Sequence, residues 1–193
     1  IRTEDGVRIR EAFVPKDGHI LISADYSQVE LRVLAHYSED PSLIDAFSKN
    51  EDIHTRTASE VSRVSIDKVS TEMRAKAKAV NFGIVYGLSA FGLSQQLGIA
   101  TSEAEETIKA YFSRYEGIER FLVSTREEAK RQGYVQTLLG RRRYLPDLGS
   151  KNKMMRSAAE RMAVNTVIQG TAADLIKKAM ITIDRVVSSE GLQ

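Results

Sequence analysis

Apolar residues recur with helical spacing through the middle of the chain, whereas both ends carry strand-like patterns. Residues 7–14 alternate between apolar and polar types and lead into a turn at residues 15–18, which predicts a strand. Ile20-Leu21-Ile22 is a short apolar run typical of a buried strand, and this strand should end at Asp25. Two strands are therefore expected before residue 26.

Helix signals follow from about residue 27 to residue 132. Ser27 with Glu30 three residues later predicts a capping box at the first helix, and Ser102 with Glu105 predicts another. The remaining signals are helix starts at Pro41, Asp52, Ser70 and Ser89, and C-terminal caps at Gly98 and Gly133.

The last part of the chain combines a hairpin with a long helix. Residues 134–138 and 143–145 flank Gly140 and predict a β-hairpin that ends at Pro146. A helix should then run from about residue 151 to residue 189, with Gly170 as its weak point. The predicted fold class is α+β and predominantly helical, with a few antiparallel strands at both ends of a helical insertion.

The net charge of +2 is small, but the charges are unevenly distributed. Residues 39–72 carry eight acidic against four basic side chains, whereas residues 126–161 carry ten basic against four acidic side chains. This asymmetry suggests an acidic outer surface and a basic surface for a polyanion. Ordinary solvated helix charge is the alternative interpretation.

Other features of the composition narrow the class of protein. The chain has no cysteine, which excludes disulfides and thiolate metal sites. It shows no signal-like segment and no apolar stretch long enough to span a bilayer. We therefore expect a soluble, intracellular protein that does not bind membranes.

Two cations and two aromatic residues recur every four residues at Arg74, Lys78, Phe82 and Tyr86. Each step turns about 400°, so the four side chains share one broad helix face about 18 Å long, similar to an extended nucleoside triphosphate. Arg and Lys bind phosphate oxygens, and aromatic rings stack on sugars and bases. The alternative is a solvated cationic stripe with two core aromatics. The face expected to pack on the body comprises Met73, Ala77, Val80 and Ile84.

Asp25, at the end of its predicted strand, is a candidate metal ligand with the Tyr26 carbonyl beside it. Nucleotidyl transfer commonly uses two divalent ions bridged by carboxylates. A turn-forming Asp at a strand end is the alternative.

Basic and amide side chains near the C-terminal helix suit nucleic acid. Arg141 and Arg142 at the hairpin tip belong to a basic cluster that would bind phosphates regardless of sequence. Arg161, Asn165 and Gln169 step by four along the helix and could reach minor-groove acceptors common to all base pairs. A polar outer helix face is the alternative.

Three strings in this order resemble the DNA polymerase I family (family A), in its palm and fingers portion. They are Asp25-Tyr26-Ser27-Gln28-Val29-Glu30, the segment from Arg74 to Gly87, and the segment from Arg161 to Gly170. The resemblance implies template-directed DNA synthesis from deoxynucleoside triphosphates on primer-template DNA, with two Mg²⁺ ions. It also implies a bacterial-type cytoplasmic, nucleoid-associated protein, with an organelle as the other location. It covers nearly the whole chain, from Ile1 to about Val187.

The resemblance also assigns roles to individual residues. Asp25 and Tyr26 would bind metal, and Asp25, Arg74 and Lys78 would take part in catalysis. Glu30 would block a ribose 2′-hydroxyl while held against Tyr86. The implied nucleotide-binding set is Gln28, Glu30, His54, Arg74, Lys78, Phe82 and Tyr86, and the implied DNA-binding set is Tyr86, Arg141, Arg142, Arg161, Asn165 and Gln169.

By the same resemblance, residues 1–26 would be palm, residues 27–133 fingers and residues 134–193 palm again. The family's second acidic motif should follow Gln193, and the thumb should precede Ile1, so this chain alone should be inactive and need those polymerase segments. A single-subunit RNA polymerase shares the cationic-aromatic helix, but Glu30 and Phe82 argue against it. Two further interpretations are a non-catalytic DNA- or nucleotide-binding module and a purely structural helical bundle.

Overall fold

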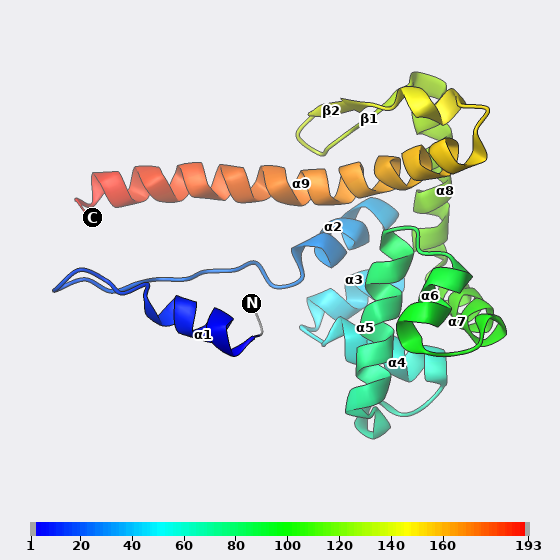
Figure 1. Ribbon diagram of the computed structural model, residues 1–193, viewed down its shortest axis with the longest axis horizontal. Helices are drawn as coiled ribbons and strands as arrows, with labels where there is room; N and C mark the ends of the chain where they lie inside the picture. The colour runs from blue at the N-terminus through cyan, green and yellow to red at the C-terminus, as the bar shows by residue number, and fades with distance from the viewer. Residues whose placement is uncertain (1–2, 192–193) are drawn as a thin grey trace.

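The computed structural model of the chain describes residues 3–191. A body of short helices is crossed by one long helix, which projects beyond it (Figure 1). The helices of the body are α2 (Val29–Ser38), α3 (Pro41–Ser48), α4 (Ile53–Ser62), α5 (Thr71–Val85), α6 (Ala90–Leu97), α7 (Thr101–Arg114) and α8 (Glu116–Gln132). The remaining elements are α1 (Glu4–Glu11), the strands β1 (Tyr134–Gln136) and β2 (Arg142–Tyr144), the 3₁₀ turns η1 (Ile66–Lys68) and η2 (Pro146–Gly149), and α9 (Lys153–Ser189).

Local capping explains where most of these helices begin and end. Asp40, Asp52, Ser70 and Ser89 each accept a hydrogen bond from a backbone N–H in the first turn of the helix that follows. Gly98 and Gly133 end α6 and α8 in the left-handed conformation. These predicted boundaries are confirmed.

Both predicted capping boxes are wrong. Gln28, with a φ of 54°, is the N-cap of α2, and its side chain makes no capping hydrogen bond. The Glu30 carboxylate accepts a hydrogen bond from the Tyr86 hydroxyl instead. Ala100, not Ser102, is the N-cap of α7. In each case Ser and Glu have the three-residue spacing of a capping box, but the helix begins at a different residue.

The N-terminal strands are a second correction. Residues 4–11 form α1, whose N-cap Thr3 accepts from the Gly6 N–H, and residues 12–28 contain turns but neither strand nor helix. Ile20, Leu21 and Ile22 are 80%, 65% and 83% exposed rather than buried. A strand needs a neighbour for its backbone hydrogen bonds, and the described residues pair none with this segment, whereas a helix closes its bonds locally.

The C-terminal prediction is confirmed. β1 and β2 form an antiparallel pair with Val135 opposite Arg143. Helix α9 continues through Gly170 without a break. An added Cβ at Gly170 would lie 2.7 Å from Thr137 Cγ2, so the glycine allows the hairpin to approach the helix closely.

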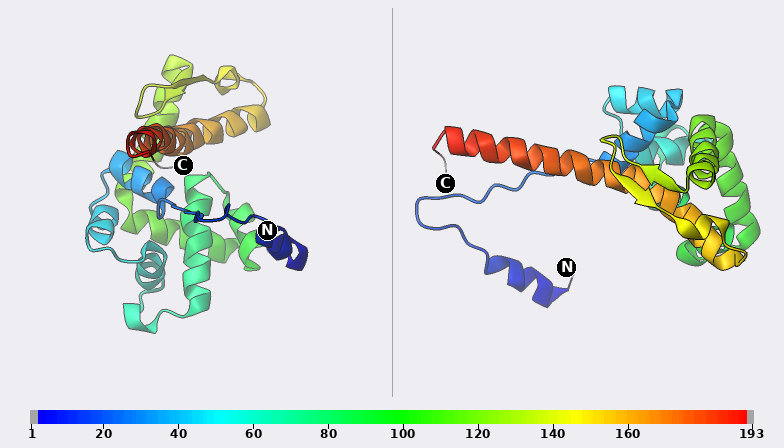
Figure 2. Two further views of the ribbon diagram at one scale, coloured as in Figure 1. Left: turned by 90° about the vertical axis from the view of Figure 1, so that its left-hand side faces the viewer. Right: turned by 90° about the horizontal axis from the view of Figure 1, so that it is seen from above.

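The hydrophobic core lies among α2, α4, α5, α7, α8 and the first half of α9. Leu34, Ile53, Tyr115, Ile118 and Ile168 are among its fully buried side chains. Beyond Asp174 the described part of α9 has no buried residue, and it projects from the body beside the segment that leads from α1 to α2 (Figures 1 and 2). Among the described residues, no helix combines the length and apolar content required to cross a bilayer.

Candidate functional site

The cationic-aromatic row lies on α5 as predicted. Arg74 and Lys78 are exposed, Phe82 and Tyr86 are half-buried, and Tyr86 is the C-cap residue of the helix. On the opposite side Ala77, Val80 and Ile84 are buried and Met73 is half-buried, so the packing face is confirmed. The row therefore borders solvent at its cationic end, and at its other end Tyr86 also packs against the core.

The first cation of the row is held by an acidic side chain that the sequence marked only as a helix start. The Arg74 guanidinium donates two hydrogen bonds to the Asp52 carboxylate, at 3.1 and 2.7 Å, while Asp52 also caps α4 through the Thr55 N–H. Burial opposes ionisation of Asp52, but the bonds from Arg74 and Thr55 outweigh it and hold the pKa of this carboxyl well below its ordinary value. Arg74 is thus oriented by a carboxylate that a phosphate would have to replace.

His54 lies beside the middle of the row, in the first turn of α4. Its ring is 3% exposed and its centroid lies 5.7 Å from that of Phe82. Burial lowers the pKa of His54; the charge of Asp52 opposes this effect, and those of Arg74 and Lys78 add to it. The structure therefore brings this residue to the predicted nucleotide-binding row.

The aromatic end of the row contacts α2. The rings of Phe82 and Tyr86 stack with centroids 6.1 Å apart and an interplanar angle of 19°. The Tyr86 hydroxyl donates to the Glu30 carboxylate, and burial raises the pKa of Glu30. The predicted contact between Glu30 and Tyr86 is confirmed.

The polar face of α9 meets the same end of α5. Gly87 has a φ of 71°, and a Cβ there would lie 2.8 Å from Arg161 Cγ, so Arg161 packs against the backbone that follows Tyr86. Gln169 is exposed, and the buried Oδ1 of Asn165 accepts no hydrogen bond from any described residue. Of the three residues predicted from spacing, Arg161 thus joins α9 to the end of α5, and Asn165 and Gln169 follow it at four-residue steps along α9.

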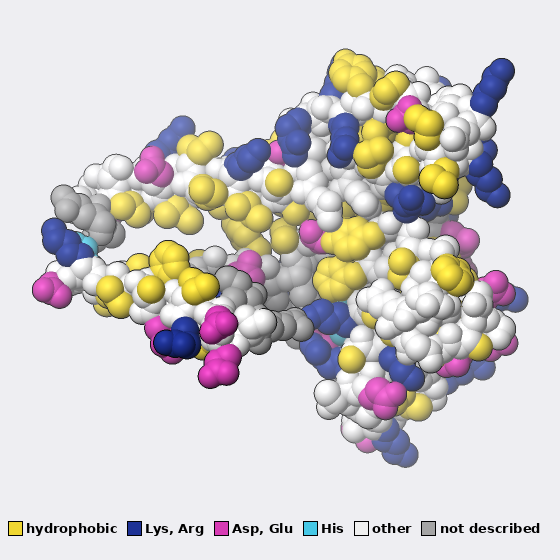
Figure 3. All heavy atoms as spheres, viewed as in Figure 1, with side chains coloured by type: hydrophobic (Ala, Val, Ile, Leu, Met, Phe, Trp, Pro, Cys, Tyr) yellow, Lys and Arg dark blue, Asp and Glu magenta, His cyan; other side chains and the backbone are white. Residues whose placement is uncertain are grey.

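The hairpin arginines differ in their contacts. The Arg141 guanidinium donates to Asp174 Oδ1 at 2.8 Å and to the Gly170 carbonyl at 3.0 Å, and this joins the hairpin to α9. Arg142 instead lies over the Tyr134 ring, 4.7 Å from its centroid. Figure 3 shows several Lys and Arg side chains over α9 and the hairpin, where the sequence predicted a basic surface.

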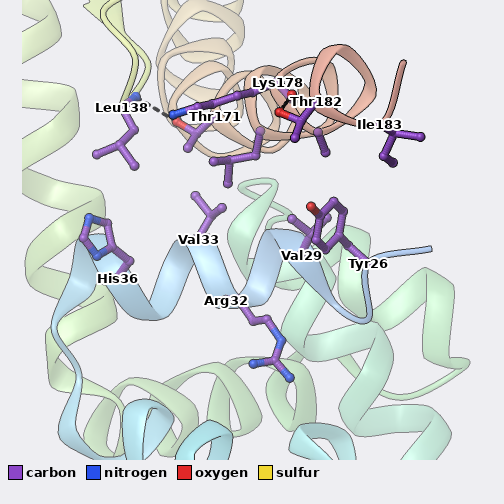
Figure 4. A pocket seen from close by; sticks show the side chains of 12 residues that line it. Tyr26, Val29, Arg32, Val33, His36, Leu138, Thr171, Lys178, Thr182 and Ile183 are labelled. Carbon is purple, nitrogen blue, oxygen red and sulfur yellow. Dashed lines mark hydrogen bonds between the residues drawn. The ribbon is translucent and has the colours of Figure 1, made fainter. Parts of the chain in front are cut away.

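The candidate metal ligand lies apart from any carboxylate cluster. Asp25 is exposed in the segment before α2, and residues 3–191 contain no group of three acidic or histidine side chains able to hold a metal. Its neighbour Tyr26 borders a cavity of about 640 Å³ between α2 and α9. Figure 4 shows Tyr26, Val29 and Val33 on one side of this cavity and Thr171, Lys178 and Thr182 on the other. The carboxylate and carbonyl oxygens suit Mg²⁺ chemically, but they do not complete a site.

Comparisons with known proteins agree with this arrangement. The chain belongs to DNA polymerase family A, whose sequence profile matches residues 1–193. It is 56% identical over 194 residues to DNA polymerase I of Bacillus caldotenax and 50% identical over 192 residues to DNA polymerase I of Pseudomonas aeruginosa. These matches cover 100% of this chain but 22% and 21% of the relatives, so the chain spans about a fifth of their length.

A solved structure supports the same relationship. The POL domain of Pol1 from M. smegmatis, in complex with DNA primer-template and dNTP, superposes with a TM-score of 0.93 at 48% sequence identity. The match covers 100% of this chain and 34% of that one. The predicted family and the predominantly helical α+β fold are confirmed.

Proposed function

We propose that this chain forms the nucleotide-binding part of a template-directed DNA polymerase and binds a deoxynucleoside triphosphate along α5. The observation that carries the proposal is the solvent-bordering row of Arg74, Lys78, Phe82 and Tyr86, with His54 beside it. The similar POL domain of M. smegmatis, described in complex with primer-template and dNTP, supports it.

Each position of the row has a distinct role in this proposal. Arg74 and Lys78 bind the triphosphate, with Arg74 exchanging the Asp52 carboxylate for phosphate oxygens. Phe82 contacts the sugar, and Tyr86 stacks near the templating base. Glu30, held by the Tyr86 hydroxyl, and Gln28 border the sugar from the start of α2.

Metal chemistry would involve the segment before α2. Asp25 and the Tyr26 carbonyl would contribute oxygen ligands for Mg²⁺, which would activate the primer 3′-hydroxyl when bound. Further ligands would have to come from outside the described residues, because these contain no cluster of three candidate ligands.

The DNA would lie along α9 and the hairpin. Arg161, Asn165 and Gln169 would contact the minor groove of the primer-template, and Asn165 Oδ1 lacks a partner among the described residues. Arg142 would bind phosphate, and Arg141 would do so while holding the hairpin on α9. In this proposal residues 27–133 are fingers, and residues 1–26 and 134–193 are palm.

A non-catalytic nucleotide- or DNA-binding module is the second candidate. The single carboxylate at Asp25, with no described cluster able to hold a metal, favours it over catalysis by this chain alone. A nucleotide-binding module would share with the polymerase the triphosphate binding by the row on α5, whereas a module that binds only DNA would not.

Lys78 provides a direct test of binding, and Lys76 is its matched control. Lys76 lies two residues away, about 200° around the helix, and pairs with Glu72 at 3.2 Å. In titrations of the chain with a dNTP, Lys78→Ala should weaken binding about tenfold, equivalent to about 1.4 kcal/mol, whereas Lys76→Ala should not. Equal effects of the two substitutions would contradict the proposal.

A further inference from the structure

A chain of buried polar side chains runs from the surface of the helical body to His54. The Tyr115 hydroxyl lies 2.8 Å from Glu60 Oε2 and 3.2 Å from Thr57 Oγ1. The Asn81 amide nitrogen lies 3.2 Å from Thr57 Oγ1 and 3.1 Å from His54 Nδ1. Tyr115, Thr57, Asn81 and His54 are each no more than 3% exposed, so each polar atom depends on the next for its hydrogen bonds.

The carboxylate at the outer end fixes the direction of these hydrogen bonds. Burial opposes ionisation of Glu60, but bonds from Arg114, Tyr115 and Arg56 keep its pKa below the ordinary value. An ionised Glu60 only accepts, so Tyr115 must donate to it. The Tyr115 oxygen can then only accept, and the Thr57 hydroxyl lies 3.2 Å away as its donor. Asn81 Oδ1, 3.3 Å from the same hydroxyl, is the competing acceptor of the Thr57 proton.

The same reasoning continues to the ring. When Thr57 gives its proton to Tyr115, the shorter of its two contacts, its oxygen accepts from the Asn81 amide nitrogen. The second proton of that amide group then points to His54 Nδ1. An imidazole nitrogen that accepts a hydrogen bond does so through its lone pair and carries no proton. Nδ1 is therefore the acceptor, and the proton of the neutral ring lies on Nε2.

We infer that the chain Glu60–Tyr115–Thr57–Asn81 holds His54 as the tautomer protonated at Nε2, with Asn81 as the positioning residue. Nε2 has no hydrogen-bond partner among the described residues, so a proton on it would be available to a ligand. This inference rests on the proposed function and adds one contact to it: the Nε2–H of His54 would donate to a phosphate oxygen of a nucleotide bound along α5. A ring with mixed tautomers would offer this donor only part of the time.

The surroundings of the ring favour the neutral form as well. Asp52 on α4 faces His54 and favours its protonation, whereas Arg74 and Lys78 on α5 oppose it. Burial also lowers the pKa of His54. The network therefore supplies a neutral N–H donor next to two cations that already provide the positive charge.

The tautomer can be measured by long-range ¹H–¹⁵N NMR spectra of the full chain, which report the protonation of each ring nitrogen. The chain has three histidines, and His54→Gln assigns the signals. At pH 7 the wild type should show a neutral His54 with the proton on Nε2. A proton on Nδ1 would overturn the inference.

Two substitutions test the network itself. Asn81→Asp places a carboxylate at Nδ1 and should raise the proton affinity of His54 about tenfold, or one pH unit. Tyr115→Phe removes one acceptor of the Thr57 proton, so Thr57 can donate to the Asn81 amide oxygen, 3.3 Å away. Because Thr57 could then donate to this oxygen in either orientation of the amide group, both tautomers of His54 should appear. Tyr111→Phe is the control. The Tyr111 ring lies 4.8 Å from that of Tyr115 and is equally buried, but its hydroxyl is not part of the chain of hydrogen bonds.

The outcomes separate this inference from the proposed function. Circular dichroism establishes that each variant is folded, and unchanged tautomers in both folded variants would refute the role of Asn81. If the wild-type ring is protonated at Nε2 but its signals do not respond to a dNTP, the positioning role stands and phosphate binding by His54 fails.

Discussion

At the scale of single residues, Glu30 shows how two interpretations of the same position are decided. Its spacing from Ser27 fits a capping box, yet α2 begins at Val29 and the Glu30 carboxylate accepts from the Tyr86 hydroxyl. A side chain at the first turn can turn back to its own backbone or reach a distant element, and only packing selects between them. Here the distant partner holds the carboxylate beside the aromatic end of α5.

Glu30→Ala should relax selection against ribonucleotides in a complete polymerase that contains this segment. The fixed carboxylate would clash with a 2′-hydroxyl, and its removal should raise ribonucleotide incorporation about tenfold or more, the scale of one steric contact in a pocket. Tyr86→Phe keeps the ring but frees the carboxylate, so it should cause a smaller increase. Single-nucleotide incorporation assays measure both, and an unchanged sugar preference in Glu30→Ala would rule out this role.

At the scale of elements, α4 and α5 are joined by Asp52, which caps one helix and binds Arg74 on the other. Asp52→Asn keeps a good N-cap but loses the ion pair, so the free energy of unfolding should fall by about 1 kcal/mol or less, since the pair is partly exposed. The depressed pKa of Asp52 means that this contribution is present at neutral pH and declines as the pH falls below about 4.

Urea unfolding at pH 7 and pH 3 measures this difference. The difference in the free energy of unfolding between wild type and Asp52→Asn should be smaller at pH 3 than at pH 7. A gap of the same size at both pH values would show that ionisation of Asp52 does not stabilise the fold.

The hairpin and α9 form the second joined pair of elements. Thr137 donates to Asp174 at 2.6 Å, and Arg141 bonds both Asp174 and the Gly170 carbonyl. A methyl group at Gly170 would lie 2.7 Å from Thr137 Cγ2 and 3.2 Å from Arg141 Nη2. The glycine that weakens the helix by its own propensity is therefore required for this contact.

Gly170→Ala should destabilise the chain by about 1–3 kcal/mol, because overpacking outweighs the gain in helix propensity. Gly149→Ala is the matched control, since a Cβ there meets no atom within 4 Å. Thermal unfolding compares the two variants. A stabilised Gly170→Ala would show that the hairpin is not held against this part of α9.

At the scale of the whole molecule, the described residues supply the proposed nucleotide-binding row on α5 but no complete metal site. Asp25 lies in an exposed segment, and no described cluster completes its coordination. Apolar side chains are also exposed along this segment and the projecting half of α9, as Figure 3 shows. The exposed apolar residues in these two regions include Ile20, Leu21, Ile22, Ile176, Met180, Ile181, Ile183 and Val186.

We expect the 193-residue chain by itself to show no primer extension with Mg²⁺ and dNTPs, because a single carboxylate with no further acidic ligand among the described residues cannot hold two ions. A gel assay on labelled primer-template measures this, with Asp25→Ala as the control for contaminating polymerase. Extension by the wild type that disappears in Asp25→Ala would contradict the expectation.

The sequence by itself determined the features that depend on local spacing. Steps of four residues placed Arg74, Lys78, Phe82 and Tyr86 on one face, and short polar side chains such as Asp52 and Ser70 marked helix starts, because helix geometry and capping involve only nearby residues. The family was also recognisable, since its strings occur in order along the chain.

Tertiary structure decided whatever required a partner distant in sequence. The bonds of Arg74 to Asp52, Glu30 to Tyr86 and Asn81 to His54 join residues 22 to 56 positions apart, and no periodicity along the chain predicts them. The contact of Glu30 with Tyr86 was expected only from the family resemblance. Residues 7–14 and 20–22 had strand-like patterns, but a strand exists only where a second strand accepts its hydrogen bonds. Without such a partner among the described residues, the first segment became largely a helix and the second remained irregular.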